Sequence, residues 1–199
     1  MMRLLAGLCF LAAACQAQEA TFGTTVVISS GLRGDIYYLK PGSTKLPKFK
    51  RMKSVGVIYA TVLNIRPRSF TSGFPGVTER FEWFAIDYNG RIWIEKPGEY
   101  RFHLVSDDGS RLYIDDHEII DNDGIHPAVA RQGAVDLSGG IHRIRLAYFQ
   151  GPRFEVALIL SVARPGESFR IFNMDEFIPP PNPDDWKYGK PENPARPPH

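Results

Sequence analysis

Short runs of alternating apolar and polar residues, separated by turn-forming residues, dominate the chain after residue 80. In the run from Tyr100 to Ser106, the apolar residues Tyr100, Phe102 and Leu104 fall on one face. This period of two is typical of a β-strand with one buried face, whereas helical periodicity is scarce. Turn formers are plentiful, with 18 Gly and 16 Pro. The sequence therefore predicts an all-β chain that folds as an antiparallel β-sandwich or barrel-like domain.

Turn signals divide this region into predicted strands. Asn89-Gly90 lies inside the alternating stretch from Glu82 to Ile94 and predicts a hairpin turn, because both residues tolerate positive φ. A second tight hairpin is predicted about residues 115–117, and a polar loop over residues 121–133. The other predicted strands, including two in the less regular N-terminal third, are residues 24–28, 34–39, 100–106, 141–149 and 154–162.

The first residues have the pattern of an export signal. Arg3 precedes an apolar stretch that ends in small residues, so residues 1–17 are predicted to be a signal peptide. In the alternative interpretation the leader ends at residue 14 and Cys15 is the lipidated first residue of a lipoprotein. The protein is accordingly expected to be exported, extracellular or periplasmic, either free or lipid-anchored to the envelope.

The remaining chain divides into three parts. Residues 18–30 are expected to form a linker or first strand, residues 31–178 the β-sandwich, and residues 179–199 a Pro-rich, extended tail. Both cysteines lie within the first fifteen residues, so no disulfide or thiolate metal site is expected in the body. No later stretch is apolar enough for a transmembrane span.

The net charge of the chain indicates few classes of binding partner. The formal net charge is only +2, so nucleic acid is not an expected partner. One basic cluster has two possible interpretations. It forms either a solvated loop or a binding surface for an anionic polysaccharide or lipid head groups. The solvated loop is favoured, because runs of charged residues are usually exposed to solvent. Its members are Lys45, Lys48, Lys50, Arg51 and Lys53.

The familiar enzyme motifs are missing, so the chain is predicted not to be an enzyme. Seven carboxylates nevertheless lie between Asp107 and Asp123. Such a density of oxygens fits either a Ca²⁺ site or ordinary polar turns. Asp107 and Asp108 are adjacent, and neighbours in a strand point to opposite faces. They can share one ion only if the backbone between them is distorted, for example by a cis peptide.

The run Ser106-Asp107-Asp108-Gly109-Ser110-Arg111-Leu112-Tyr113-Ile114-Asp115 resembles the protective-antigen-type domain family. Further matching segments are residues 98–102, 120–127, 139–142, 148–152 and 156–165 and, less strongly, residues 31–38. The resemblance covers roughly residues 31–178. It implies a β-sandwich that often binds carbohydrate without catalysis of its own. In the family's sugar-binding members, two adjacent aspartates hold Ca²⁺, which coordinates sugar hydroxyls. Asp107 and Asp108 match them, while Gln150 stands in the loop where the family usually supplies an Asn ligand.

The predicted function is therefore that of an exported, non-catalytic carbohydrate-binding module whose recognition of glycan hydroxyls is assisted by calcium. Asp107, Asp108 and Gln150 are the predicted metal ligands, and Phe149, Arg153 and Phe154 the predicted ligand-binding residues. The partner would be a glycan or polysaccharide. In the alternative, the same fold serves without a ligand as a structural or protein-interaction module that contacts envelope proteins or a secretion assembly. An accessory subunit of a polysaccharide-degrading enzyme is a third interpretation.

Overall fold

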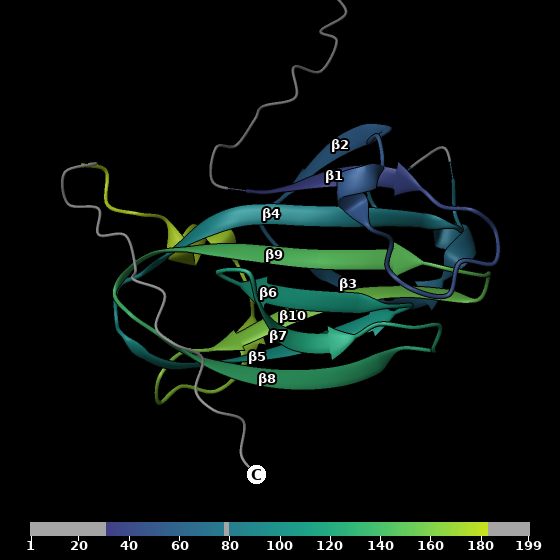
Figure 1. The fold of residues 1–199 in the computed structure, drawn as a ribbon. Coiled ribbons are helices and arrows are strands. Elements are labelled where there is room, and N and C mark those ends of the chain that lie inside the picture. The colour runs from purple at the N-terminus through teal and green to yellow at the C-terminus, as the bar shows by residue number, and fades with distance from the viewer. Residues whose placement is uncertain (1–30, 78–79, 183–199) are drawn as a thin grey trace, which may run out of the picture.

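Two antiparallel β-sheets pack face to face in the computed structural model, which describes residues 31–77 and 80–182 (Figure 1). The predicted antiparallel β-sandwich is confirmed. The six-stranded sheet has the order β2 (Gly56–Ala60), β1 (Leu32–Tyr38), β4 (Phe84–Ile94), β9 (Gly140–Gln150), β6 (Ser110–Ile114) and β7 (His117–Asn122). The second sheet has the order β11 (Arg170–Ile171), β10 (Glu155–Ala163), β5 (Gly98–Asp107) and β8 (Val129–Leu137), and β3 (Asn64–Ser69) also pairs with β10.

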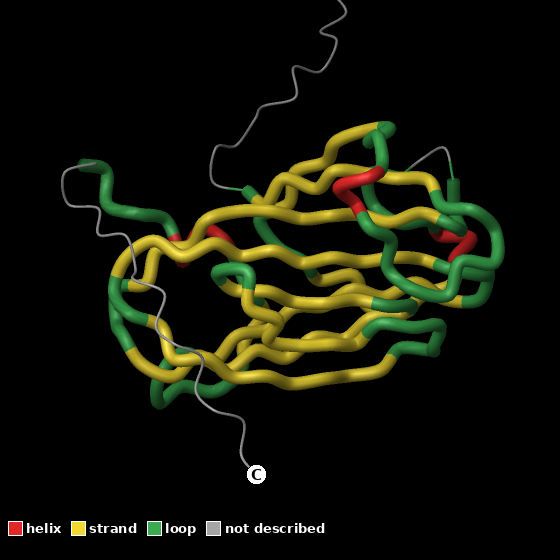
Figure 2. The backbone as a smooth tube through the Cα atoms, viewed as in Figure 1, coloured by secondary structure: helices red, strands yellow, loops and turns green. Residues whose placement is uncertain are grey.

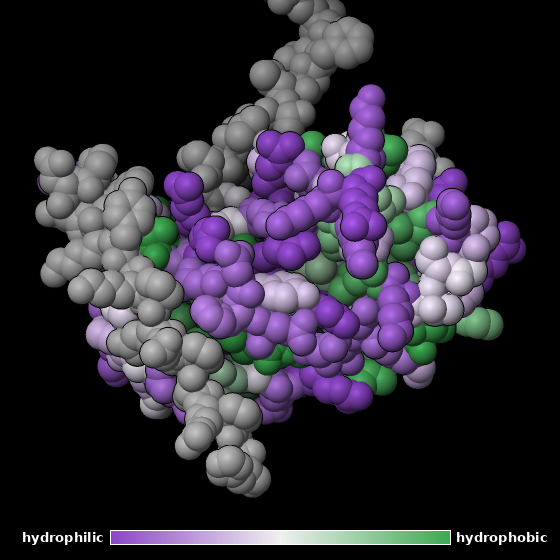
Figure 3. Space-filling view, in the orientation of Figure 1, coloured by the Kyte–Doolittle hydropathy of each residue, from purple (hydrophilic) through white to green (hydrophobic). Residues whose placement is uncertain are grey.

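The core lies between the inner faces of the two sheets. Tyr100, Phe102 and Leu104 of β5 are buried there together, as their alternation predicts. Residues of β4 and β9 face them from the other sheet, among them Ile86 and Leu146. Removal of this apolar surface from water is the main force that holds the sheets together. The outer face of the six-stranded sheet, which is turned toward the viewer, is largely hydrophilic (Figure 3).

The predicted hairpin at Asn89-Gly90 is wrong, because β4 runs without a break from Phe84 to Ile94. Asn89 pairs with Arg33 on one side and with Arg145 on the other. Gly90 is needed here for close packing and not for a turn. A Cβ on Gly90 would lie 2.6 Å from Cδ2 of Leu32, which is buried. A dipeptide signal for a turn has therefore been overridden by pairing on both edges of a central strand.

The predicted hairpin about residues 115–117 is confirmed. Asp115 and Asp116 both have positive φ, at 48° and 67°, and connect β6 to β7. The loop predicted over residues 121–133 is confirmed only for residues 123–128, because β7 runs through Asn122 and β8 begins at Val129 and pairs with β5. This strand lies at the edge of its sheet and is mostly exposed, so its sequence lacks the apolar alternation of the inner strands.

Helical structure in the described residues is limited to three short 3₁₀ turns, η1 (Phe49–Arg51), η2 (Phe70–Ser72) and η3 (Met174–Phe177) (Figure 2). Within this part of the chain, no helix has the length and apolar character that crossing a membrane requires. The predicted signal peptide, Cys15, the expected strand at residues 24–28 and most of the Pro-rich tail lie outside the described residues.

Candidate functional site

Three loops meet at one end of the sandwich and enclose a pocket of about 390 Å³. They connect β5 to β6, β7 to β8 and β9 to β10 (Figure 1). The residues that line the pocket are Asp107, Asp108, Ile125, His126, Pro127, Pro152, Phe154 and Glu155. Because the loops come from both sheets, the site exists only once the sandwich has formed.

The two adjacent aspartates are joined by a cis peptide bond. The distortion expected from the sequence is therefore confirmed, and both residues line the same pocket. Both are also buried, with exposed fractions of 5% for Asp107 and 3% for Asp108. Gly109 follows them at a position with no room for a side chain, because a Cβ would lie 2.4 Å from the Phe149 ring and 2.7 Å from the backbone nitrogen of Gly124.

Asp108 is held firmly by its neighbours. Its Oδ2 accepts hydrogen bonds from the N–H of Gly151 at 2.7 Å and from the Gln150 amide at 3.3 Å. Its Oδ1 accepts a third from the N–H of His126 at 3.2 Å. Burial raises the pKa of Asp108, although the two backbone hydrogen bonds work in the opposite direction. Asp108 thus ties the β7–β8 and β9–β10 loops together.

Asp107 has the opposite character. Within the described residues its carboxylate has no hydrogen bond and no ion pair, although its backbone oxygen accepts a hydrogen bond from the Tyr148 hydroxyl at 2.7 Å. Burial, followed by the charges of Asp108 and Glu155, raises the pKa of Asp107 to about 7. A buried carboxylate without a partner beside a second carboxylate is a suitable place for a cation.

Gln150 does not offer its amide oxygen to the pocket, which corrects its assignment as a metal ligand. That oxygen accepts a hydrogen bond from the Tyr148 hydroxyl at 2.6 Å. The amide nitrogen faces three oxygens, those of the Asp108 side chain and of the Pro152 and Glu155 backbones, at 3.3, 3.4 and 3.0 Å. The reverse orientation would place oxygen against oxygen, so the network fixes this one. Gln150 therefore positions Asp108.

The three predicted ligand-binding residues differ in their exposure and position. Phe149 is completely buried beneath Gly109, so it cannot stack on a ligand. Its side chain lies on the opposite face of β9 from that of Tyr148 and packs in a second hydrophobic cluster with Tyr37 and Phe49. Phe154, by contrast, is 82% exposed and lines the pocket. Arg153 lies beside it in the same loop, where its guanidinium pairs with Glu82 at 3.2 Å.

The sequence interpretation missed the contribution of the β7–β8 loop. Ile125 is 45% exposed at the pocket, and the backbone of His126 holds Asp108. A signal was present, because Ile120 to Pro127 belongs to the segment that carries the family resemblance. Glu155 was missed as well, since it reads as the ordinary start of a strand.

The donor set fits a calcium ion in part. Asp107 supplies an unpaired, buried carboxylate, and Asp108 lies beside it. Across residues 31–77 and 80–182, no group of three or more His, Cys, Asp and Glu side chains is placed to hold a metal ion. Since Ca²⁺ takes six to eight oxygens, most of its coordination would come from backbone oxygens, water or a bound ligand. Such a site is expected to be weak.

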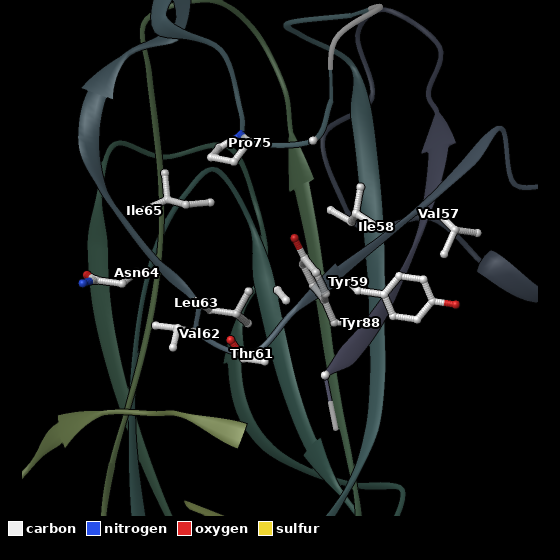
Figure 4. Close-up of a pocket in the computed structure, with 13 residues that line it drawn as sticks. Val57, Ile58, Tyr59, Thr61, Val62, Leu63, Asn64, Ile65, Pro75 and Tyr88 are labelled. Carbon is white, nitrogen blue, oxygen red and sulfur yellow. The ribbon is translucent and has the colours of Figure 1, made fainter. Parts of the chain in front are cut away.

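A larger hollow of about 690 Å³ lies between β2 and β3 (Figure 4). Val57 and Tyr59 lie on one side of it and Val62 and Asn64 on the other, with Tyr88 between them. None of the described residues that line this hollow is charged. It therefore lacks the carboxylates that line the smaller pocket.

The arrangement defines a class: a two-sheet β-sandwich that carries a paired-aspartate pocket on its loops. Residues 39–171 match the PA14 domain family, so the chain belongs to that family. Comparison with curated protein sequences gives no match.

Solved structures share the fold. A PA14 sugar-binding domain from an RTX adhesin is 19% identical with a TM-score of 0.60, over 73% of this chain and 96% of that one. The epithelial adhesin 9 A domain from Candida glabrata, solved with Galβ1-3GlcNAc, is 14% identical with a TM-score of 0.52, over 74% and 88%. An anti-sigma factor domain-containing protein is 21% identical with a TM-score of 0.59, over 77% of this chain but 49% of its own, so this chain spans about half its length.

Proposed function

We propose that this protein is an exported, non-catalytic carbohydrate-binding module in which Asp107 and Asp108 hold a calcium ion. The observation that carries the proposal is the buried, unpaired carboxylate of Asp107 beside Asp108 at the wall of an open pocket. The sugar-binding RTX adhesin domain and the glycan complex of the Candida glabrata adhesin support a carbohydrate as the ligand.

Each part of the pocket has a role in this proposal. Calcium, when bound, supplies positive charge and coordination positions for hydroxyl oxygens. Asp108 is fixed by Gly151, His126 and Gln150, so its carboxylate is oriented before any ligand arrives. The exposed Phe154 and Ile125 offer an apolar surface to the C–H face of a sugar ring.

The proposal of a non-catalytic role rests on the lack of a recognisable catalytic arrangement in the described residues. Asp115, His142 and Ser138 resemble a hydrolytic triad in composition. However, Nε2 of His142 lies 3.0 Å from the Ser138 carbonyl oxygen, against 3.5 Å from the hydroxyl, and His142 is buried. A ring nitrogen that donates to a carbonyl cannot act as a base toward the hydroxyl.

The deciding experiment measures thermal unfolding with and without several millimolar CaCl₂. An affinity of about 10⁻⁴–10⁻³ M would raise the melting temperature of the wild type by a few degrees. Asp107→Asn should abolish this rise, and because the replaced carboxylate has no partner, the variant should be at least as stable as the wild type in EDTA. Asp108→Asn is a weaker test, since Asp108 accepts three hydrogen bonds and its loss perturbs both loops.

Asp136→Asn is the matched control, because Asp136 is exposed on β8 away from the pocket and should leave the calcium response unchanged. A glycan array read in calcium and again in EDTA then tests ligand binding on the same proteins. If the wild type shows no calcium-dependent shift, the calcium-assisted mechanism fails, and the alternative of an interaction module in an envelope or secretion assembly replaces it.

A further inference from the structure

A strongly basic segment lies next to the candidate pocket. Residues 40–53 contain six lysine and arginine residues and no acidic residue, a charge of +6 in a chain whose net charge is +2. All six side chains are exposed, and none forms an ion pair with any described residue. The members of this basic segment are Lys40, Lys45, Lys48, Lys50, Arg51 and Lys53.

The basic segment is held in place by its apolar residues. Phe49 is buried and packs on Tyr37, with ring centroids 5.0 Å apart. Leu46 and Met52 pack into the same hydrophobic cluster, while the cations between them point to solvent. Like charges on a fixed scaffold repel one another, and an anionic partner would offset this repulsion.

Direct contacts connect the basic segment to the pocket. The N–H of Leu46 donates to Oδ1 of Asp123 at 2.9 Å, and Asp123 begins the loop that brings Ile125 and His126 to the pocket. The cluster that holds Phe49 also contains Phe149, whose ring lies under Gly109. The segment therefore contacts the β7–β8 loop through Leu46 and shares a hydrophobic cluster with Phe149, which packs against the glycine that follows the aspartate pair.

Strand pairing places the two features at the same end of the sandwich. Tyr38 at the end of β1 pairs with Phe84, and Phe84 pairs with Gln150 at the end of β9. The chain leaves β1 for the basic segment at this end, where the β5–β6 and β9–β10 loops also lie (Figure 1). A ligand that extends from the pocket toward the β7–β8 loop would meet the cations.

We propose that the ligand is an anionic glycan, with one sugar residue at the aspartate pocket and the carboxylates or sulfates of neighbouring residues bound by the basic segment. This deepens the proposed function and rests on it. Lysine ammonium groups are point charges on flexible stems, so they can neutralise acidic groups at varied positions along a chain. Such contacts speed association and make affinity depend on salt.

The test compares sulfated chondroitin oligosaccharides with the same oligosaccharides after desulfation and carboxyl reduction, in calcium at low and high NaCl. The wild type should bind the acidic probe at least about tenfold more tightly than the neutral one, with a preference that shrinks in salt. Reversal of three charges, in Lys45→Glu, Lys48→Glu and Lys50→Glu combined, should remove the preference and leave neutral binding in place.

The matched control reverses three exposed cations on other elements, Arg66→Glu, Lys96→Glu and Arg131→Glu combined, and should keep the preference. Equal binding of both probes, abolished by Asp107→Asn, would overturn this inference and leave the proposed function standing. Acidic binding that survives Asp107→Asn would also overturn it, because the basic segment would then act apart from the pocket. If anionic vesicles bind through the basic segment and neither probe binds, a membrane surface is the partner of the segment and this inference fails, while the calcium-dependent unfolding and the glycan array still decide the proposed function.

Discussion

At the scale of single residues, the partners of a buried polar side chain indicate its role. Asp107 and His142 are both buried, yet only His142 has charged and polar partners among the described residues. Its Nδ1 lies 2.6 Å from Asp115 and its Nε2 3.0 Å from the Ser138 carbonyl. Both partners are acceptors, so the protonated ring satisfies them best. Asp107 has no such partner and therefore suits a cation instead.

The His142–Asp115 pair should make stability depend on pH. Burial works against the charged ring, but the hydrogen bonds to Asp115 and Ser138 outweigh it and raise the pKa of His142, while the pKa of Asp115 is lowered. The stabilisation from His142 is complete below its ordinary pKa of about 6.5 and is lost as the pH rises through the raised value. That from Asp115 is present above its ordinary pKa and is lost as the pH falls through the lowered value.

Denaturant unfolding at a series of pH values checks this. Because the raised pKa of Asp107, about 7, also lowers stability as the pH rises toward 7, the series is measured in the Asp107→Asn variant. There the free energy of unfolding should fall as the pH is raised from 6 to 9, and the further change Asp115→Asn should cost roughly 1–3 kcal/mol at pH 6 and flatten the profile. His117→Gln, which changes an exposed histidine on the same hairpin, should retain the profile of the Asp107→Asn variant. An Asp115→Asn variant with an unchanged profile would contradict the assignment.

At the scale of elements, close backbone approach explains glycines that resemble turn signals. Gly90 lies in the middle of β4 where Leu32 leaves no room for a side chain. Gly133 lies in β8, where a Cβ would come within 2.2 Å of the Ile119 carbonyl oxygen on β7. The two strands belong to different sheets, so Gly133 permits the sheets to approach at this edge.

Gly133→Ala should accordingly destabilise the protein by roughly 2–4 kcal/mol, because a backbone carbonyl cannot move aside as the end of a side chain can. Gly139→Ala is the control, since its nearest contact is 3.7 Å away and its cost should stay below about 1 kcal/mol. The comparison needs only the melting temperatures and the free energies of unfolding. Equal effects of the two substitutions would rule out a close approach at Gly133.

At the scale of the whole molecule, the pocket joins the two sheets. Asp107 ends β5 of one sheet, whereas Gln150 ends β9 of the other, and Asp108 bonds to Gln150 and Gly151 across the gap. A cation held at this point therefore stabilises the sandwich as a unit and not one loop alone.

Hydrogen exchange can test this coupling. Calcium should slow exchange of the slowest amides in β5, β9 and β10 by a common factor, about tenfold if the ion is present at ten times its dissociation constant. Protection confined to the β5–β6 and β9–β10 loops would mean that the ion orders only its own surroundings. Asp107→Asn provides the baseline, because it should exchange alike with and without calcium.

The fold class, most strand positions and the distortion at Asp107-Asp108 are predictable from the order of the residues alone. Alternation in a strand depends on which face meets the core, and two neighbouring carboxylates cannot share an ion on a regular strand; both are local constraints that a sequence displays. An exposed edge strand has no buried face to impose this alternation, so the sequence predicts a loop where β8 begins.

The surroundings of the two aspartates depend on the packing of the folded chain. It buries Phe149, directs the Gln150 amide oxygen to Tyr148 and brings the β7–β8 loop, with the basic segment behind it, to the pocket. None of this follows from spacing along the chain. Leu46 and Asp123 are separated by 77 positions, and only the packing of the two sheets and their loops brings such distant segments within hydrogen-bond distance.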